Sequence, residues 1–168
     1  MKKLLTIILL LIMTLTFSGC FFSDYNGPSA IETAKKVLEC FDNDDVEGLK
    51  SLFCEDVLTN VDDLDEQIKE IFNLYEGKSV ERGTIRGGSS EKSYREGELV
   101  FYDIGPSIDD IKTDKSDKYY SIQLCMHLVN KKHPERVGIG AIILYAYDAP
   151  YPKWEDVSEL KTIGKLYL

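Results

Sequence analysis

The spacing of apolar residues changes from a helical to a strand period about halfway along the chain. From Ser29 to Gly77, apolar residues recur every three or four positions, which is the period of an amphipathic helix. Beyond Gly77 they alternate with polar residues, as in a half-buried strand, and clusters of Gly, Ser and Pro separate the runs. The sequence therefore predicts helices followed by strands.

Three helices are predicted in the first part. The first follows Ser29, which has capping-box spacing to Glu32. The second takes its N-cap from Asp44–Asp45, and the third begins near Asp62–Asp63 and stops at Gly77. The apolar stripes of these helices are Ala30, Ala34, Val37, Leu38 and Phe41, then Val46, Leu49, Leu52 and Phe53, and then Leu64, Ile68, Ile71, Phe72 and Tyr75.

About four strands are predicted after Gly77. A weak candidate covers residues 80–85 and a better one 96–104, and a hairpin loop over 130–136 joins the two clearest, 119–128 and 137–147. In the strand over 119–128 one face is strongly apolar, with Tyr120, Ile122, Leu124, Met126 and Leu128. Both faces of the last strand are apolar, which is typical of a central strand or an interface. The expected fold class is α+β, with three N-terminal helices packed on a curved antiparallel sheet.

The first residues carry a targeting signal. Lys2 and Lys3 precede an apolar run of 14 residues, Leu4–Phe17, which is shorter than the about 20 residues that a membrane-spanning helix needs. The following Ser18-Gly19-Cys20 resembles the lipobox of bacterial lipoproteins, with Phe17 in place of the usual leucine. The resemblance implies that Cys20 is acylated and becomes the first residue after cleavage. A buried core helix or an uncleaved anchor is the alternative interpretation.

This interpretation divides the chain into a lipoprotein signal peptide over residues 1–19, a short lipidated tether over 20–27 and a single domain over 28–168. The protein is expected on the outer face of the cell membrane, held in the lipid bilayer through Cys20. After cleavage, the remaining chain would contain 18 basic and 29 acidic residues, which gives it a formal charge of −11. Nucleic acid is not expected as a partner, because phosphate neutralisation requires clustered Lys and Arg.

Several runs of residues resemble known families. The segments similar to the front end of a nuclear transport factor 2-like cone are Ala34–Phe41, Asp45–Lys50 and Phe53–Cys54. The segments similar to a family of Gram-positive lipoproteins known as domain of unknown function 5104 are Leu64–Glu66, Ile104–Pro106, Ile111–Lys115 and Val137–Ile139. The resemblance implies helices in the concave side of a curved sheet, often with a pocket, for which Tyr120, Met126 and Ile143 are the candidate lining residues. It assigns no activity.

The cysteines offer one possible crosslink. Of the three that remain besides Cys20, the pair Cys40 and Cys54 is best placed for a disulfide in an oxidising compartment. In a tight antiparallel hairpin of the first two helices, Cys54 would lie about 7.5 Å beyond the position opposite Cys40. The helices would therefore have to cross at an angle for a disulfide to form. The alternative is that both are small apolar residues of the core.

No metal or cofactor is expected. Cys125 and His127 share one strand face, but no second pair of ligands at a suitable spacing accompanies them. The acidic runs 42–45 and 62–66 lack the spacing of a calcium loop, and the turn at 86–90 lacks the ending of a phosphate-binding loop.

Three classes of function remain open. The leading hypothesis is a binding module for a small apolar or amphipathic ligand. The alternative is a domain that meets another cell-envelope protein or a second copy of itself, through an outer face with Tyr119, Gln123, Ile142 and Leu144. An isomerase-like or dehydratase-like enzyme is a third hypothesis, with His127, Tyr119 and Tyr120 as candidates. Alternation argues against it, because His127 and Tyr119 should point to the outer side of the sheet.

The anchor gives a direct prediction. Because the thiol of Cys20 would carry the lipid, the Cys20→Ser variant should leave the membrane fraction for the medium or remain unprocessed. Cell fractionation with immunodetection checks this. Normal processing and membrane retention of the variant would contradict the lipoprotein interpretation.

Overall fold

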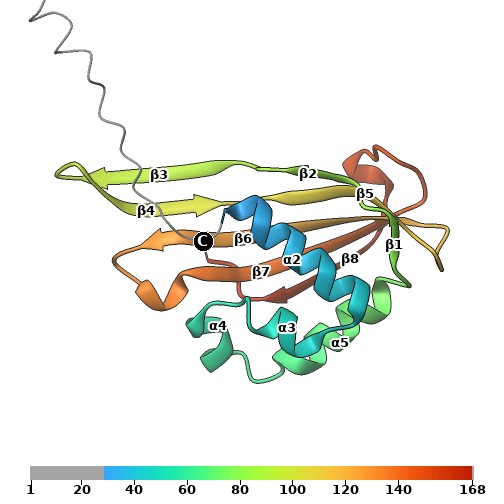
Figure 1. The fold of residues 1–168 in the computed structure, drawn as a ribbon, viewed down its shortest axis with the longest axis horizontal. Coiled ribbons are helices and arrows are strands. Elements are labelled where there is room, and N and C mark those ends of the chain that lie inside the picture. The colour runs from blue at the N-terminus through green and yellow to red at the C-terminus, as the bar shows by residue number, and fades with distance from the viewer. Residues whose placement is uncertain (1–28, 168) are drawn as a thin grey trace, which may run out of the picture.

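The computed structural model describes residues 29–167, and the predicted signal peptide and lipidated Cys20 lie outside them. Four α-helices of the described chain come first, followed by strands (Figure 1). The helices are α2 (Ala30–Asn43), α3 (Val46–Lys50), α4 (Glu55–Asn60) and α5 (Leu64–Leu74). The three predicted helices correspond to α2, α3 and α5, and α4 was not predicted. Within the described range, no helix is both long and apolar enough to cross a bilayer.

The N-terminal caps of the first two helices act as predicted, whereas Asp63 precedes α5 without a capping hydrogen bond from its side chain, and α5 ends at Leu74, before Gly77. Ser29 Oγ accepts a hydrogen bond from the Glu32 backbone N–H, and the Glu32 carboxylate accepts one from Ser29 N–H, which completes the capping box. Asp45 Oδ1 accepts from Gly48 N–H and starts α3. Helix α2 ends at Asp44, whose φ of 50° closes the last turn in the left-handed conformation.

The strands of the described chain form one open antiparallel sheet with eight members. They are β1 (Ser79–Glu81), β2 (Thr84–Arg86), β3 (Ser90–Arg95), β4 (Glu98–Ile104), β5 (Ser107–Thr113), β6 (Tyr119–Asn130), β7 (Gly138–Tyr147) and β8 (Val157–Gly164). The expectation of about four strands was too low. Strands β3, β5 and β8 were missed, and the weak candidate over 80–85 is divided between β1 and β2.

The long strand β6 organises the sheet. One edge pairs with β5 near Tyr119 and with β4 near Asn130, and the other edge pairs with β7, which in turn pairs with β8. Strands β4 and β5 therefore follow one another along β6, interrupted only by Gly105 and Pro106. Figure 1 shows the helices gathered on one side of this sheet. We call the opposite side the far face.

The helix-covered face of β6 carries the core. Tyr120, Ile122 and Leu124 are at most 1% exposed, and they pair with Ala146, Leu144 and Ile142 on β7. The predicted apolar face of β6 is thus confirmed. The proposed outer face with Ile142 and Leu144 was wrong, because both side chains are fully buried. A bulge at Gly140 shifts the alternation of β7, which the uniform pattern of the sequence had concealed.

The three candidate pocket residues do not share one site. Tyr120 and Met126 are buried in the core beneath the helices. Ile143 pairs with Gln123 and so lies on the far face, where alternate residues of β6 point. The Tyr120 ring also packs against the Tyr75 ring, at a centroid distance of 5.1 Å.

The cysteines of the described chain are free thiols, so the possible Cys40–Cys54 disulfide is not formed in the structure. Cys40 lies in the last turn of α2, whereas Cys54 precedes α4 and packs against Gly138 at the start of β7. Both are buried, as the alternative interpretation expected. Burial raises the pKa of the Cys40 thiol to about 11, which keeps it protonated at neutral pH.

Phe41 supplies a test of the helical core. Its side chain is 1% exposed, and its ring meets Phe72 and Tyr75 edge to face at 5.1 and 5.2 Å. Phe41→Ala should therefore lower the free energy of unfolding by about 3 to 5 kcal/mol, measured by urea denaturation. Ile31→Ala on the exposed side of the same helix is the control and should change it by about 0.5 kcal/mol or less. Equal destabilisation by both variants would show that the helix register is wrong.

Candidate anion-binding site

The end of the chain turns back over the sheet after β8. Gly164 has a φ of +80°, and the next residue donates its backbone N–H to Gly140 O at 2.7 Å. This turn brings the ring of Tyr167 against Gly140, where a Cβ atom would lie only 2.7 Å from Tyr167 Cε2. Glycine is therefore needed at position 140 for the ring to reach the sheet.

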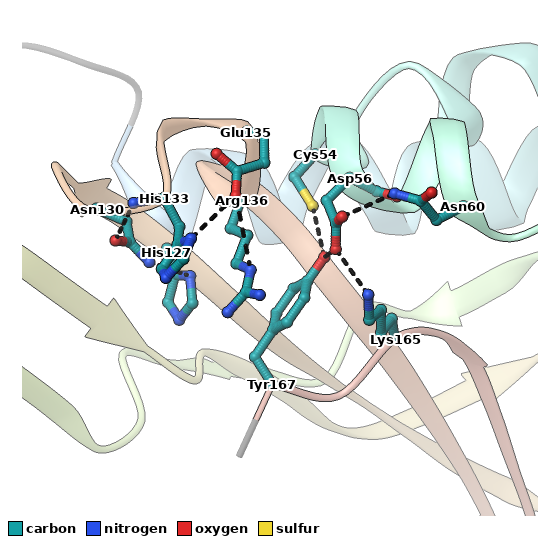
Figure 2. Close-up of polar contacts among 10 residues, drawn as sticks. All are labelled: Cys54, Asp56, Asn60, His127, Asn130, His133, Glu135, Arg136, Lys165 and Tyr167. Atoms are coloured by element: carbon teal, nitrogen blue, oxygen red, sulfur yellow. Dashed lines mark hydrogen bonds and ion pairs between the residues drawn. The ribbon is translucent and has the colours of Figure 1, made fainter.

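Polar contacts fix the tip of Tyr167. Its hydroxyl donates to Asp56 Oδ2 at 2.8 Å and lies 3.3 Å from Cys54 Sγ (Figure 2). The ammonium group of Lys165 also binds Asp56 Oδ2, at 2.9 Å, and Asn60 donates to the other carboxylate oxygen. These hydrogen bonds, with that of Lys165 the strongest, hold the pKa of Asp56 below its usual range. Burial and the neighbouring Cys54 and Asp56 raise the pKa of Tyr167, which stays neutral.

Tyr167 in turn covers His127. The two rings lie 5.7 Å apart, and Phe101 contacts the imidazole at 5.2 Å, so His127 is only 9% exposed. Asn130 Nδ2 lies 3.4 Å from Nδ1, and Asp103 Oδ1 lies 3.7 Å from Nε2. The alternation of β6 places His127 opposite the helix-covered face, as expected, but it is buried there. The sequence offered no sign that the chain end would cover it.

Beside His127 lies a cavity of about 700 Å³, which we call the cationic cavity. Its charged side chains are Arg95, Lys131, Lys132 and Arg136. His127, His133, Asn130 and the apolar Val100, Phe101 and Tyr167 complete the lining, and no carboxylate belongs to the lining that the structure describes. This is a local excess of positive charge in a chain of formal charge −9.

Arg136 is the best positioned of these cations. Its guanidinium lies over the Tyr167 ring, 4.7 Å from the centroid, and its Nε is 4.0 Å from Glu135 Oε1. Nε is buried without a hydrogen bond to any residue that the structure describes. The same carboxylate oxygen of Glu135 lies 3.1 Å from His133 Nδ1. Asn130 Oδ1 accepts a hydrogen bond from the His133 backbone N–H. The loop that carries Arg136 is thereby tied to the end of β6.

The other cations are less restrained. Lys131 pairs with Glu98 at 2.6 Å, but its side chain is half exposed, so this pair contributes little to stability. Arg95 ends the exposed strand β3, and Lys132 is exposed beside it in the cavity lining. Such solvated side chains raise the local potential and adapt to a ligand, whereas Arg136 presents a fixed planar group.

The structure does not bring the enzyme candidates together. Tyr119 and His127 are eight residues apart on β6, about 26 Å along the strand, and Tyr120 points to the opposite face. Among the described residues, no three His, Cys, Asp or Glu side chains are grouped to hold a metal. The sequence predicts residues 130–136 only as a hairpin loop, and nothing local links its Lys131, Lys132 and Arg136 to Tyr167.

These features define an α+β protein with an open antiparallel sheet and a basic cavity at the end of its longest strand. Residues 36–147 match the family described as Domain of unknown function (DUF5104), and the chain belongs to that family. The matched segment spans about two thirds of the chain and includes His127 and Arg136, whereas Tyr167 lies beyond it. No curated protein matches the chain.

The contacts of Asp56 predict a pH-dependent stability. Because its pKa is lowered in the folded state, the stabilisation is complete above the unfolded value, near 3.8, and is lost as the pH falls through the folded value. Asp56→Asn should therefore unfold at lower urea concentration than the wild type at pH 7, and the two should converge as the pH falls below the lowered pKa of Asp56. Asp148→Asn, at an exposed position after β7, is the control. If the difference in stability between Asp56→Asn and the wild type did not vary with pH, the assigned role of the Asp56 charge would be contradicted.

Proposed function

We propose that this protein is an extracytoplasmic lipoprotein, anchored through acylated Cys20, whose folded domain binds a small anionic ligand in the cationic cavity. We further propose that its fold is of the nuclear transport factor 2-like kind, which the succession of helices and a sheet covered on one side supports. The lipobox-like residues 17–20 support the anchor, and the cavity supports the binding function.

The observation that carries the proposal is the charge of the cavity. Four Lys and Arg side chains line it, although acidic residues outnumber basic ones by 29 to 20 in the whole chain. Glu98 and Glu135 compensate part of this charge at Lys131 and Arg136, whereas Arg95 and Lys132 form no ion pair with a described residue, so a bound anion would lower the free energy of the remaining positive charge. The cavity volume of about 700 Å³ lies within the range of about 300 to 1,000 Å³ found for small-molecule sites.

The lining also indicates how a ligand would be held. The Arg136 guanidinium lies over the Tyr167 ring, and its terminal amino groups can meet two oxygens of a carboxylate or phosphate at once. Val100, Phe101 and the Tyr167 ring offer an apolar wall for the body of the ligand. The site therefore favours a molecule with an oxyanion at one end and an apolar or aromatic body.

Calorimetric titration of the full-length protein in detergent with inorganic phosphate and with benzoate tests this proposal. At least one anion should bind saturably, and more weakly as the salt concentration rises. Arg136→Gln should weaken binding about tenfold to a hundredfold, the effect of losing a charge-assisted hydrogen-bonding pair.

Arg82→Gln is the matched control, because Arg82 is an exposed arginine between β1 and β2, outside the cavity. Its affinity for the anion should equal that of the wild type. The proposal fails if neither anion binds, or if Arg82→Gln and Arg136→Gln weaken binding to the same extent.

A further inference from the structure

A second cavity lies on the far face, near the other end of β6. Its volume is about 320 Å³. Gln123 on β6 lines it, four residues before His127, so the two cavities are separated by about 13 Å along the strand. This second site is independent of the function proposed above, and we call it the polar cavity.

Small side chains create the hollow. Ser107 and Ser121 lie on neighbouring strands, and Gly105 adds no side chain between β4 and β5. The Tyr145 ring supplies the accessible aromatic surface, because Tyr147 belongs to the lining but is only 1% exposed. Pro152, from the chain that follows β7, also lines the cavity. The cavity thus combines aromatic surface with many short polar groups.

The floor of the polar cavity is rigid. The hydroxyl of Tyr147 lies 2.8 Å from Ser121 Oγ and accepts the backbone N–H of Asp110 at 3.0 Å. The hydroxyl of Tyr145 donates to Gln123 Oε1 at 3.1 Å, which fixes the orientation of the amide. These contacts pre-organise the groups that face the hollow, and pre-organisation lowers the entropic cost of binding.

Two polar groups remain for a ligand. The oxygen of the Gln123 amide is engaged, and its NH₂ group makes no hydrogen bond to a side chain or backbone group in the described range. Asp109 Oδ2 accepts from Arg86 Nε at 2.8 Å and from Ser107 Oγ at 3.3 Å, whereas no described residue donates to Oδ1. Because Ser107 pairs with Gln123 across β5 and β6, this donor and this acceptor belong to neighbouring strands.

The charges of the polar cavity are balanced. Arg86 forms an ion pair with Asp109, so the carboxylate does not demand a cationic ligand. The remaining cation, Lys153, is 80% exposed and lies 3.6 Å from Glu155. An anion is favoured far more by the cationic cavity. The polar cavity therefore suits an uncharged molecule that both donates and accepts hydrogen bonds.

We propose that the polar cavity binds a neutral polyhydroxylated ring, the chemistry of a sugar. Adjacent hydroxyl groups each donate and accept, so one can donate to Asp109 Oδ1 while its neighbour accepts from Gln123. The C–H face of such a ring can pack on the Tyr145 ring. A volume of about 320 Å³, near the lower limit of small-molecule sites, fits a single ring or a short oligomer.

The test is a titration of the full-length protein in a detergent without a sugar head group, followed by saturation-transfer NMR. The probes are glucose, N-acetylglucosamine, cellobiose, chitobiose and myo-inositol. At least one should bind saturably. Gln123→Leu and Asp109→Asn should each raise its Kd about tenfold, because Gln123→Leu removes the amide donor and Asp109→Asn removes the charge and replaces one acceptor oxygen by a donor.

Arg136→Gln separates this proposal from the one for the cationic cavity. It should leave the Kd of the sugar unchanged, and Gln123→Leu should leave the anion affinity unchanged. Melting temperatures confirm that each variant is folded. The proposal is overturned if none of the five probes binds saturably, or if a folded Gln123→Leu and a folded Asp109→Asn both bind the probe as the wild type does.

Discussion

The alternation of side chains along β6 is the constraint on which the rest of the structure depends. Tyr120, Ile122 and Leu124 must lie beneath the helices, because their burial provides much of the core. The residues between them then point away from the helices, whatever their chemistry. Gln123 and His127 belong to that second set, and each lines one of the two cavities. The sheet therefore has the packed core on one face and both cavities on the other.

The fold also depends on the close approach of the Tyr167 ring to the backbone of β7. At Gly140 a bulge and a missing side chain admit the ring of Tyr167, which then covers His127 and supports Arg136. Asp56 holds the hydroxyl of that ring from the start of α4. The cationic cavity is consequently lined by residues of β3, β4 and β6, by the loop after β6 and by the chain end, and α4 contributes only the hold on Tyr167. A change at Gly140 would disturb all of these contacts without touching a ligand.

The sequence predicted what depends on neighbouring residues and missed what depends on distant ones. The caps at Ser29 and Asp45 are local hydrogen bonds, and both are present as expected. Strand β3 was missed because all of its residues are exposed and lack an apolar period, and β5 because Asp110, with a φ of 60°, breaks the alternation. Tyr167 reaches Asp56 across 111 positions of sequence, and no pattern in either segment indicates that contact.

Strand β3 ends the path of paired strands, with β4 on one side. An open edge of this kind can template pairing with another molecule, and attachment to a membrane would confine copies to two dimensions and raise their encounter rate. The exposed strand carries Glu91, Lys92 and Arg95 within six residues. These charges would have to be desolvated in an edge-to-edge dimer, so they disfavour aggregation through β3.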